Sequence, residues 1–269
     1  MLTEHKQPLP DSHRVRLGEA PHFEMKLATH RDEIEEAQRL RYQVFFEEIG
    51  AREASAPCAD SAIAYASSRL DIDQYDADCE HLIVRDLNTL QVVGCYRIMR
   101  PETALRRGGY YADSEFDLSR LRHLRGRMVE AGRACIHPDY RSGSVIMLLW
   151  SGISRFMIDN GYEYLIGCAS VSLADGGANA LALHQMAVKE WQAPAEYQVL
   201  AHCPFPLQGE VAATPQVPPL IKGYIRLGAW INGYPAWDPD FNTADFFTLL
   251  PLARMSGKYL KHFMRFAES

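Results

Sequence analysis

Hydrophobic and polar positions change their spacing several times along the chain, as they do when strands alternate with helices. From residue 30 to residue 48 the apolar residues recur every three or four positions, which predicts an amphipathic helix capped by Thr29 and ended by Gly50. Apolar runs bounded by polar turns predict strands. The predicted strands are 22–29, 81–87, 91–99, the run that begins at Met128, 163–171 and 243–252, and further helices are expected before Trp150, at 178–191 and at 218–227.

The alternation of these elements predicts the α/β (α+β) class, with a mixed and mostly antiparallel sheet flanked by helices. The chain has 269 residues, of which 47% are apolar, so it can bury a full core. We therefore expect one domain over 22–269 behind a flexible segment over 1–21. The stretch between residues 99 and 128 is expected to be a loop.

The first residues are too polar for a secretory signal, and no apolar run approaches the roughly 18 residues that span a bilayer. We expect a cytoplasmic protein without a transmembrane segment, and peripheral contact with the inner membrane stays open. The six cysteines are widely spaced and include no C-x-x-C pair, which argues against a zinc site or a disulfide framework. No metal is expected.

Charge is distributed unevenly. The net charge of -6 disfavours a nucleic-acid partner, but residues 97–141 contain ten arginines, no lysine and six acids, a local charge of +4. Residues 71–80 contain five acids. The first region suits an anionic ligand and the second a cationic one, while two solvated polar faces remain the simpler interpretation of most of these charges.

Several common chemistries lack their motifs. The chain contains no G-x-x-x-x-G-K-[ST] loop, no G-x-G-x-x-G turn and no G-x-S-x-G elbow, which excludes the usual nucleotide, dinucleotide and serine-hydrolase sites. The acidic run is not an EF-hand loop, because Asp76 stands where that loop needs Gly.

The turn before Trp150 has the composition of an anion-binding site. Backbone N–H groups at the start of a helix are unpaired and carry the positive end of its dipole, so they can receive a phosphate. The candidate residues for this cradle are Arg141, Ser142, Gly143 and Ser144. A plain helix N-cap by Ser142 or Ser144 is the alternative.

The strand, R-S-G-S turn and helix resemble the acyl-cofactor-binding core of GCN5-related N-acetyltransferases, which implies a splayed sheet that holds a thioester donor. A second resemblance is to the acyl-homoserine-lactone synthases, which use thioesters of acyl carrier protein. It is carried by Arg41-x-x-x-Phe45, Asp73-x-x-Asp76, Arg97 and Glu130-x-x-Arg133.

A broader resemblance covers nearly the whole chain. It implies the N-acyltransferases of ornithine lipid biosynthesis, which transfer a 3-hydroxyacyl group from acyl carrier protein to the α-amine of ornithine and need no further cofactor. The product is a lyso-ornithine lipid. The resemblance is carried by RYQVFFEEIGA (41–51), DIDQYDADCEHLIV (71–84), VVGCYRIM (92–99), SEFDLSRL (114–121), EAGRACIHPDYR (130–141) and PPLIKGYIRLGAWINGYPAWDPDFNT (218–243).

Two departures refine this resemblance. Ser144 and Ile146 stand where the usual acetyltransferase turn has glycines, so coenzyme A is a less suitable donor than a carrier protein, which brings only one phosphodiester. Ala51 replaces the Trp that lactone synthases tend to have, and those enzymes lack the Pro218-Pro219 block. Both features weigh against a synthase of a diffusible signal.

Glu130 is the candidate catalytic base, because an amino acid's α-amine must lose a proton before it attacks a thioester. Arg97 and Arg133 are expected to bind the acceptor carboxylate or the pantetheine arm. Strand alternation would place residues 130 and 133 on opposite faces, so we predict a β-bulge at Gly132. An ion pair between Glu130 and Arg133 or Arg97 that only braces the strand is the alternative.

The remaining candidates line the substrate pocket. Arg41 and Phe45 share a helix face and are expected to offer a charge and an aromatic wall. Asp73 and Asp76 would hold a cationic acceptor or orient the arginines. Asp238 and Asp240 are candidate partners for a side-chain ammonium, although a turn beside Pro239 explains them nearly as well.

Four alternatives stay open. Cys135 and His137 share a strand face and would permit an acyl-enzyme intermediate. Glutamine, lysine or glycine would need only a different side-chain pocket than ornithine. A lactone synthase would consume S-adenosylmethionine instead. A non-catalytic module would bind an acyl ligand or a carrier protein, for which the basic segment 97–141 is equally suited.

Overall fold

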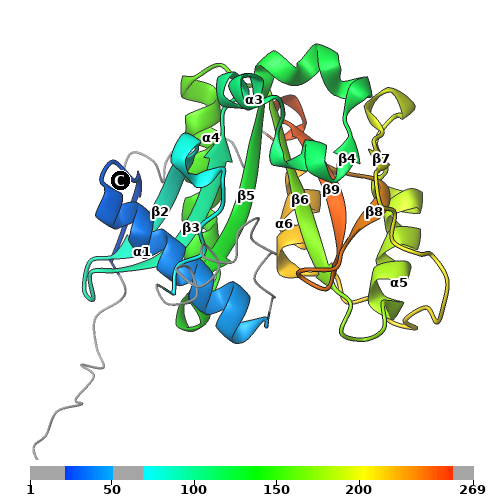
Figure 1. Ribbon diagram of the computed structural model, residues 1–269, viewed down its shortest axis with the longest axis horizontal. Coiled ribbons are helices and arrows are strands. Elements are labelled where there is room, and N and C mark those ends of the chain that lie inside the picture. Colours follow the sequence, from blue (N-terminus) through cyan, green and yellow to red (C-terminus); the bar gives the residue numbers. More distant parts are fainter. Residues whose placement is uncertain (1–21, 51–68, 257–269) are drawn as a thin grey trace, which may run out of the picture.

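The computed structural model describes residues 22–50 and 69–256. Their main feature is a seven-stranded mixed sheet in the order β1-β2-β3-β5-β6-β9-β8, in which only β5 and β6 run parallel (Figure 1). The strands of this sheet are β1 Phe23–Leu27, β2 Glu80–Asp86, β3 Gln91–Met99, β5 Met128–Ile136, β6 Tyr164–Ser172, β8 Trp230–Asp238 and β9 Thr243–Pro251.

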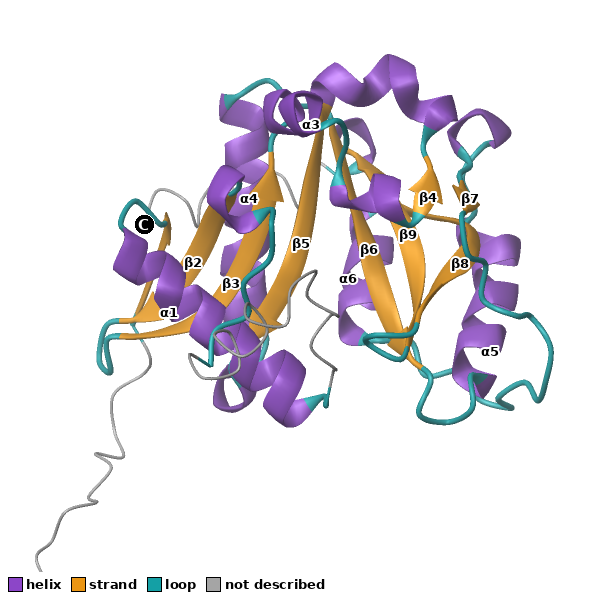
Figure 2. Ribbon diagram, in the orientation of Figure 1, coloured by secondary structure: helices purple, strands orange, loops and turns teal. Residues whose placement is uncertain are grey.

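Helices cover both faces of this sheet (Figure 2). Helix Arg31–Tyr42 packs on β3 and its neighbours, and helix Ser144–Asp159 packs against the opposite face of the same strands. Helices Ala178–Met186 and Pro219–Leu227 cover the half of the sheet formed by β6, β9 and β8, whereas helix Pro101–Arg107 contacts the 3-10 helix Ser119–Arg127. The helices are α1 Arg31–Tyr42, α3 Pro101–Arg107, α4 Ser144–Asp159, α5 Ala178–Met186 and α6 Pro219–Leu227, and the short strands β4 Phe116–Asp117 and β7 Leu200–Ala201 form a separate pair.

The two halves of the sheet separate between β5 and β6. These strands pair only from Met128 with Tyr164 to Glu130 with Ile166, and beyond that point they diverge (Figure 1). The backbones are still close where they part, because a Cβ on Gly167 would lie 2.5 Å from the carbonyl oxygen of Ala131. The divergence opens a gap in the sheet. The close approach of the two backbones at the narrow end of this gap depends on glycine at position 167.

A β-bulge in β5 determines which side chains share a face. Cys95 pairs with Cys135 but Arg97 pairs with Gly132, so β5 contains one extra residue between these pairs. Arg133 absorbs the distortion with a φ of 53°. Side chains that face α1 are therefore even-numbered before the bulge and odd-numbered after it, which brings residues 130 and 133 to the same face.

The predicted bulge is confirmed, but the expected role of Gly132 is wrong. Gly132 is not among the residues with positive φ, and a Cβ there would meet no atom within 4 Å. The left-handed residue is Arg133, a conformation that costs a non-glycine residue about 1 kcal/mol or more. The ion pairs of its side chain hold it in place, as described below.

Most predicted elements are confirmed. The first helix begins one residue later than expected, with His30 instead of Thr29 as the N-cap, because the Glu33 carboxylate accepts from both backbone N–H groups. It continues as a π-helix to Glu48, and Gly50 follows with a φ of 77°.

The two longest parts of the chain that were not predicted are the stretch before β5 and strand β8. The stretch between 99 and 128 is not a loop but contains α3 and two 3-10 helices, Tyr111–Ser114 and Ser119–Arg127. Strand β8 was missed because Gly, Pro and Asn interrupt its apolar pattern. The segment expected to be flexible, 1–21, lies outside the described residues. Parts of 22–269 lie outside them as well, so a single domain over that range stays a prediction. None of the helices within 22–50 and 69–256 is long and apolar enough to cross a bilayer.

A buried charge cluster fixes α1 to the sheet. Arg41 on α1 is 1% exposed, and its guanidinium donates to Asp71 at 2.6 Å and to both oxygens of Asp76 at 2.8 and 3.0 Å. Burial alone would raise the pKa of Asp76, but Arg41 outweighs it and holds that pKa well below its usual range. The segment before β2 is thereby tied to α1.

We expect Asp76→Asn to lower the free energy of unfolding by about 3–5 kcal/mol, because it leaves buried arginines without a counter-charge. Asp78→Asn is the matched control, since Asp78 is half-exposed in its pair with Arg107 and should cost at most about 1 kcal/mol. Urea denaturation measures both. The carboxylate's contribution exists only while Asp76 is ionised, so the difference from wild type should shrink well below pH 4. Equal costs for the two variants would contradict this account.

We expect Gly167→Ala to destabilise the fold by about 1–3 kcal/mol, because the new methyl group would press on the Ala131 carbonyl where β5 and β6 part. Gly126→Ala is the control, since a Cβ there meets no atom within 4 Å. Thermal denaturation at neutral pH compares the two. Similar thermal midpoints for the two variants would show that β5 and β6 can move apart freely at the narrow end of the gap.

Candidate active site

A pocket of about 210 Å³ occupies the gap between the two halves of the sheet. Its walls come from β3 and β5 on one side, from β6 and the hairpin β8–β9 on the other, and from the end of the first helix. Among the predicted site residues it is lined by Phe45, Arg97, Glu130, Arg133 and Asp238.

Glu130 lies on the pocket wall but is only 5% exposed. Its two carboxylate oxygens accept hydrogen bonds from the backbone N–H groups of Tyr111 at 2.7 Å and Ala112 at 2.8 Å. Burial raises the pKa of Glu130 to about 7, although these hydrogen bonds and the charge of Arg97 oppose the rise. A carboxyl group with this pKa can both accept and return a proton near neutral pH.

Glu130 does not form the bracing ion pair considered above. Within the described part of the chain, no ion pair joins it to Arg97 or Arg133, because both guanidinium groups are turned toward aspartates. Arg97 donates to Asp73 at 2.5 Å and to Asp76 at 3.0 Å. The carboxylate is therefore held in place by backbone amides, and no cation in the described part of the chain pairs with it directly.

Arg133 is held in the same cluster but reaches further into the pocket. Its guanidinium pairs with Asp73 at 3.0 Å and with Asp71 at 3.3 Å. Its Cζ atom lies over two aromatic rings, 5.7 Å from the ring centre of Tyr111 and 5.6 Å from that of Phe241. The aspartates and rings orient Arg133 as a donor with one edge left for a ligand.

The structure decides between the two roles considered for Asp73 and Asp76. Both carboxylates are occupied by arginines, which outweigh burial and lower the pKa of each. They therefore orient the arginines and are not free to receive a cationic acceptor. Arg41 was wrongly expected at the pocket, because Asp71 and Asp76 enclose its guanidinium below the wall.

Phe45 lies on the pocket wall, as expected, and packs its ring edge against Phe241 at 6.4 Å between centroids. The other aromatic partner on this side, Phe46, approaches the same ring at 6.5 Å. The C-terminal end of the first helix therefore supplies an apolar wall of the pocket, in addition to the charged groups of β3 and β5.

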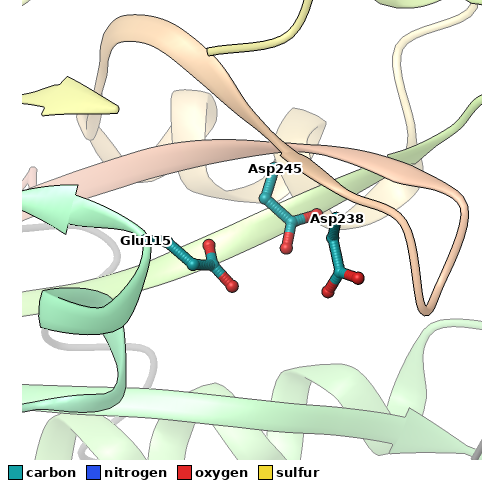
Figure 3. A group of neighbouring side chains, drawn as sticks. All are labelled: Glu115, Asp238 and Asp245. Atoms are coloured by element: carbon teal, nitrogen blue, oxygen red, sulfur yellow. The ribbon is translucent and has the colours of Figure 1, made fainter. Parts of the chain in front are cut away.

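Three carboxylates gather on the opposite wall. Glu115, Asp238 and Asp245 each offer an oxygen within 4.8 Å of the other two (Figure 3). Burial and the neighbouring acid raise the pKa of Glu115 to about 8, and burial raises that of Asp245 to about 6. Asp240 is exposed, and its backbone N–H donates to Asp238, so it belongs to the turn and not to the pocket.

The candidate phosphate cradle lies at an exposed turn outside the pocket lining. Gly143 is the N-cap of α4 with a φ of 109°, and no side chain caps that helix, so the alternative of a cap by Ser142 or Ser144 is wrong. Arg141 forms a bidentate pair with Glu48 at 2.6 and 2.7 Å. The first N–H groups of α4 remain available to an anion.

The Cys135 and His137 alternative receives no support from the geometry. The Cys135 thiol is 3% exposed beneath α1 and faces the carbonyl oxygen of Leu40 at 3.5 Å. Burial raises its pKa well above the usual value. His137 approaches Gln43 instead, at 3.5 Å. A thiol that is buried, protonated and remote from a base is a poor nucleophile.

Sequence reasoning missed Tyr111, Glu115 and Asp245 as site residues. Tyr111 acts through its backbone and an aromatic face, which no motif records. Asp245 is a single acid in the apolar run TADFF, and that pattern was an available signal, since a lone acid is costly to bury without a purpose. Glu115 lies between Asp113 and Asp117 and offers no such signal.

Comparisons with known proteins agree with this geometry. Residues 40–151 match the family model described as an acetyltransferase (GNAT) domain. A solved structure of an N-acyl amino acid synthase from uncultured soil microbes covers 93% of this chain and 99% of its own, with a TM-score of 0.51. At 11% identity this likeness concerns the fold alone, and the expected acetyltransferase-like fold is confirmed.

Curated relatives resemble the chain over nearly its whole length. The L-ornithine N(alpha)-acyltransferase of Brucella abortus is 36% identical over 264 residues, which is 93% of this chain and 91% of the relative. The protein of the same name from Agrobacterium fabrum is 38% identical over 256 residues, or 90% of this chain and 85% of the relative. The prediction of an acyltransferase is thereby confirmed. The chain belongs to the family of L-ornithine N(alpha)-acyltransferases.

Proposed function

We propose that this protein forms an amide between a fatty acyl group, carried as a thioester on acyl carrier protein, and the α-amine of L-ornithine. The observation that carries the proposal is Glu130, a buried carboxyl with a pKa near 7 on the wall of the pocket where the sheet separates. Kinship with L-ornithine N(alpha)-acyltransferases supports the choice of acceptor. The product is a lyso-ornithine lipid.

The reaction begins with the loss of a proton from the acceptor. Its α-amine is an ammonium near neutral pH, and Glu130 takes one proton directly or through one water. The amine then attacks the thioester carbonyl, a C–N bond forms, and the C–S bond breaks. The thiolate of the pantetheine arm leaves with the proton that Glu130 returns, and the nitrogen of the new amide releases its second proton to solvent. The thioester already carries the acyl group in activated form, so the proposed reaction uses no bound cofactor.

The acceptor's carboxylate is assigned to Arg133. This guanidinium is oriented by two aspartates and two aromatic rings and lies on the pocket wall beside Glu130. Arg97 is more deeply buried, with 5% of its surface exposed, and its charge lowers the pKa of Glu130. The geometry therefore favours Arg133 for the acceptor and a supporting role for Arg97.

The donor is assigned to a carrier protein because its single phosphodiester needs only the free N–H groups at the start of α4. Exposed basic residues for an acidic carrier protein, Arg120 and Arg122, lie on the 3-10 helix Ser119–Arg127, which is near the other end of α4. Such a surface increases the rate of encounter with an oppositely charged partner.

Purified protein mixed with 3-hydroxyacyl carrier protein and ornithine should form a lyso-ornithine lipid that mass spectrometry detects by its mass. Parallel reactions with acyl-coenzyme A, with glutamine, lysine or glycine, and with S-adenosylmethionine test the other donors and acceptors. Lactone formation, or binding of carrier protein without any amide product, would refute the proposal. A faster reaction with acyl-coenzyme A would refute the assigned donor alone.

Glu130→Gln should lower kcat/KM by roughly 10²- to 10⁴-fold, the usual contribution of a positioned base. In wild type, kcat/KM should rise with pH through about 7, because only ionised Glu130 accepts a proton. This limb should vanish in the variant, whose residual rate would follow the ionisation of the amine. Cys135→Ala is the control and should retain turnover. Loss of turnover in Cys135→Ala with an active Glu130→Gln would instead require an acyl-enzyme.

A further inference from the structure

We infer that Glu115, Asp238 and Asp245 form a subsite for the side-chain ammonium of the acceptor, so that the pocket selects a diamino acid over an amino acid with a neutral side chain. The inference rests on the proposed function, since it concerns the same pocket. It replaces the pair Asp238 and Asp240 expected from the sequence, because Asp240 is exposed and does not line the pocket.

The three acids come from separate elements and converge on one point. Glu115 follows the 3-10 helix Tyr111–Ser114, Asp238 ends β8, and Asp245 lies in β9 opposite Ala236 (Figure 3). Their oxygens lie within 4.8 Å of one another. Asp238 and Asp245 also line the pocket that contains Glu130.

Asp238 accepts from the backbone N–H groups of Asp240 and Phe241, but the two acids beside it lack the cationic partners that buried acids normally have. Neither oxygen of Glu115 is exposed, and neither has a hydrogen-bond donor in the described part of the chain. The Tyr111 hydroxyl and the Cys168 thiol face this carboxylate without hydrogen-bonding geometry. Asp245 is 4% exposed, and one of its oxygens accepts from Thr243 at 2.9 Å. No arginine, lysine or histidine of the described ranges pairs with any of the three.

A buried carboxylate without a counter-charge is unstable, and it responds by retaining a proton. The raised pKa values of Glu115 and Asp245 express this lack of a cation. The arginines at the other end of the pocket cannot supply it, because each is already paired with aspartates. An ammonium group from a ligand would supply the missing charge and up to three hydrogen-bond donors.

The position of the subsite suits an acceptor with two amines. Tyr111 donates its backbone N–H to Glu130, and Glu115 is the residue that follows the same short helix, four positions after Tyr111. Four residues of 3-10 helix advance about 8 Å. This is of the order of the distance between the two nitrogens of an extended ornithine, whose amines are separated by four carbon atoms. One amine can thus lie near Glu130 while the other lies between the acids.

Competition between L-ornithine and L-norvaline tests the subsite, because norvaline has the same carbon chain without the second amine. With acyl carrier protein as donor, wild type should favour ornithine in kcat/KM. Glu115→Gln and Asp245→Asn should each lower this preference about 10- to 100-fold, the factor expected when a charged hydrogen bond is lost. Norvaline turnover should be unchanged or faster. Asp240→Asn is the matched control and should retain the wild-type preference.

The other outcomes are distinguishable. Equal losses for both amino acids, or an unchanged preference, would overturn the subsite while the proposed function stands. Wild-type protein that acylates neither amino acid would refute the proposed function, and the subsite with it. Calorimetric titration with Ca²⁺ or Mg²⁺ provides a further check, since tight metal binding that Asp245→Asn abolishes would overturn the assignment to an ammonium.

Folding defects can be separated from loss of recognition. Replacing a carboxylate in this cluster by an amide removes repulsion between like charges, so the thermal midpoint should be unchanged or higher. If Asp245→Asn is nevertheless unstable, Asp238→Asn at the more exposed side of the cluster gives the same comparison of ornithine with norvaline. A stable Asp238→Asn variant with the wild-type preference would then count against the subsite.

Discussion

The architecture depends on keeping three arginines charged inside the protein. They enter from α1, β3 and β5, while the three aspartates that neutralise them all come from the single segment before β2. A buried charge without its partner costs several kcal/mol, so these elements can pack together only in the arrangement that completes every pair. The arginines are Arg41, Arg97 and Arg133, and the aspartates are Asp71, Asp73 and Asp76.

This cluster also gives the pocket two electrostatically different ends. At the β3–β5 end the charges are balanced and the donors of Arg133 are already oriented, so a carboxylate can bind without reorganisation of the protein. At the β8–β9 end the acids are unbalanced. Glu130 lies on β5 and is held by amides of the 3-10 helix Tyr111–Ser114. Such a pocket matches a molecule with an anionic group at one end and a cationic group at the other.

Local patterns predicted the parts of this structure that local physics determines. Helical spacing located the first helix, and apolar runs located six of the strands, whereas β8 was missed because its glycine, proline and asparagine hide a strand that long-range pairing stabilises. Family resemblance identified Glu130 and the arginines. It could not reveal Glu115 or Asp245, whose meeting depends on the distant pairing of β6, β8 and β9.

The bulge in β5 means that the site depends on the conformation of one strand as well as on the identity of its residues. Because side chains alternate, a regular strand over the same residues would turn Arg133 toward α4 and bring Ala134 to the face that Glu130 occupies. The spacing of Glu130 and Arg133 therefore serves the pocket only in a strand that carries one extra residue at this point. Relatives that keep both residue types at this spacing bring the acid and the arginine together only if they also keep the bulge.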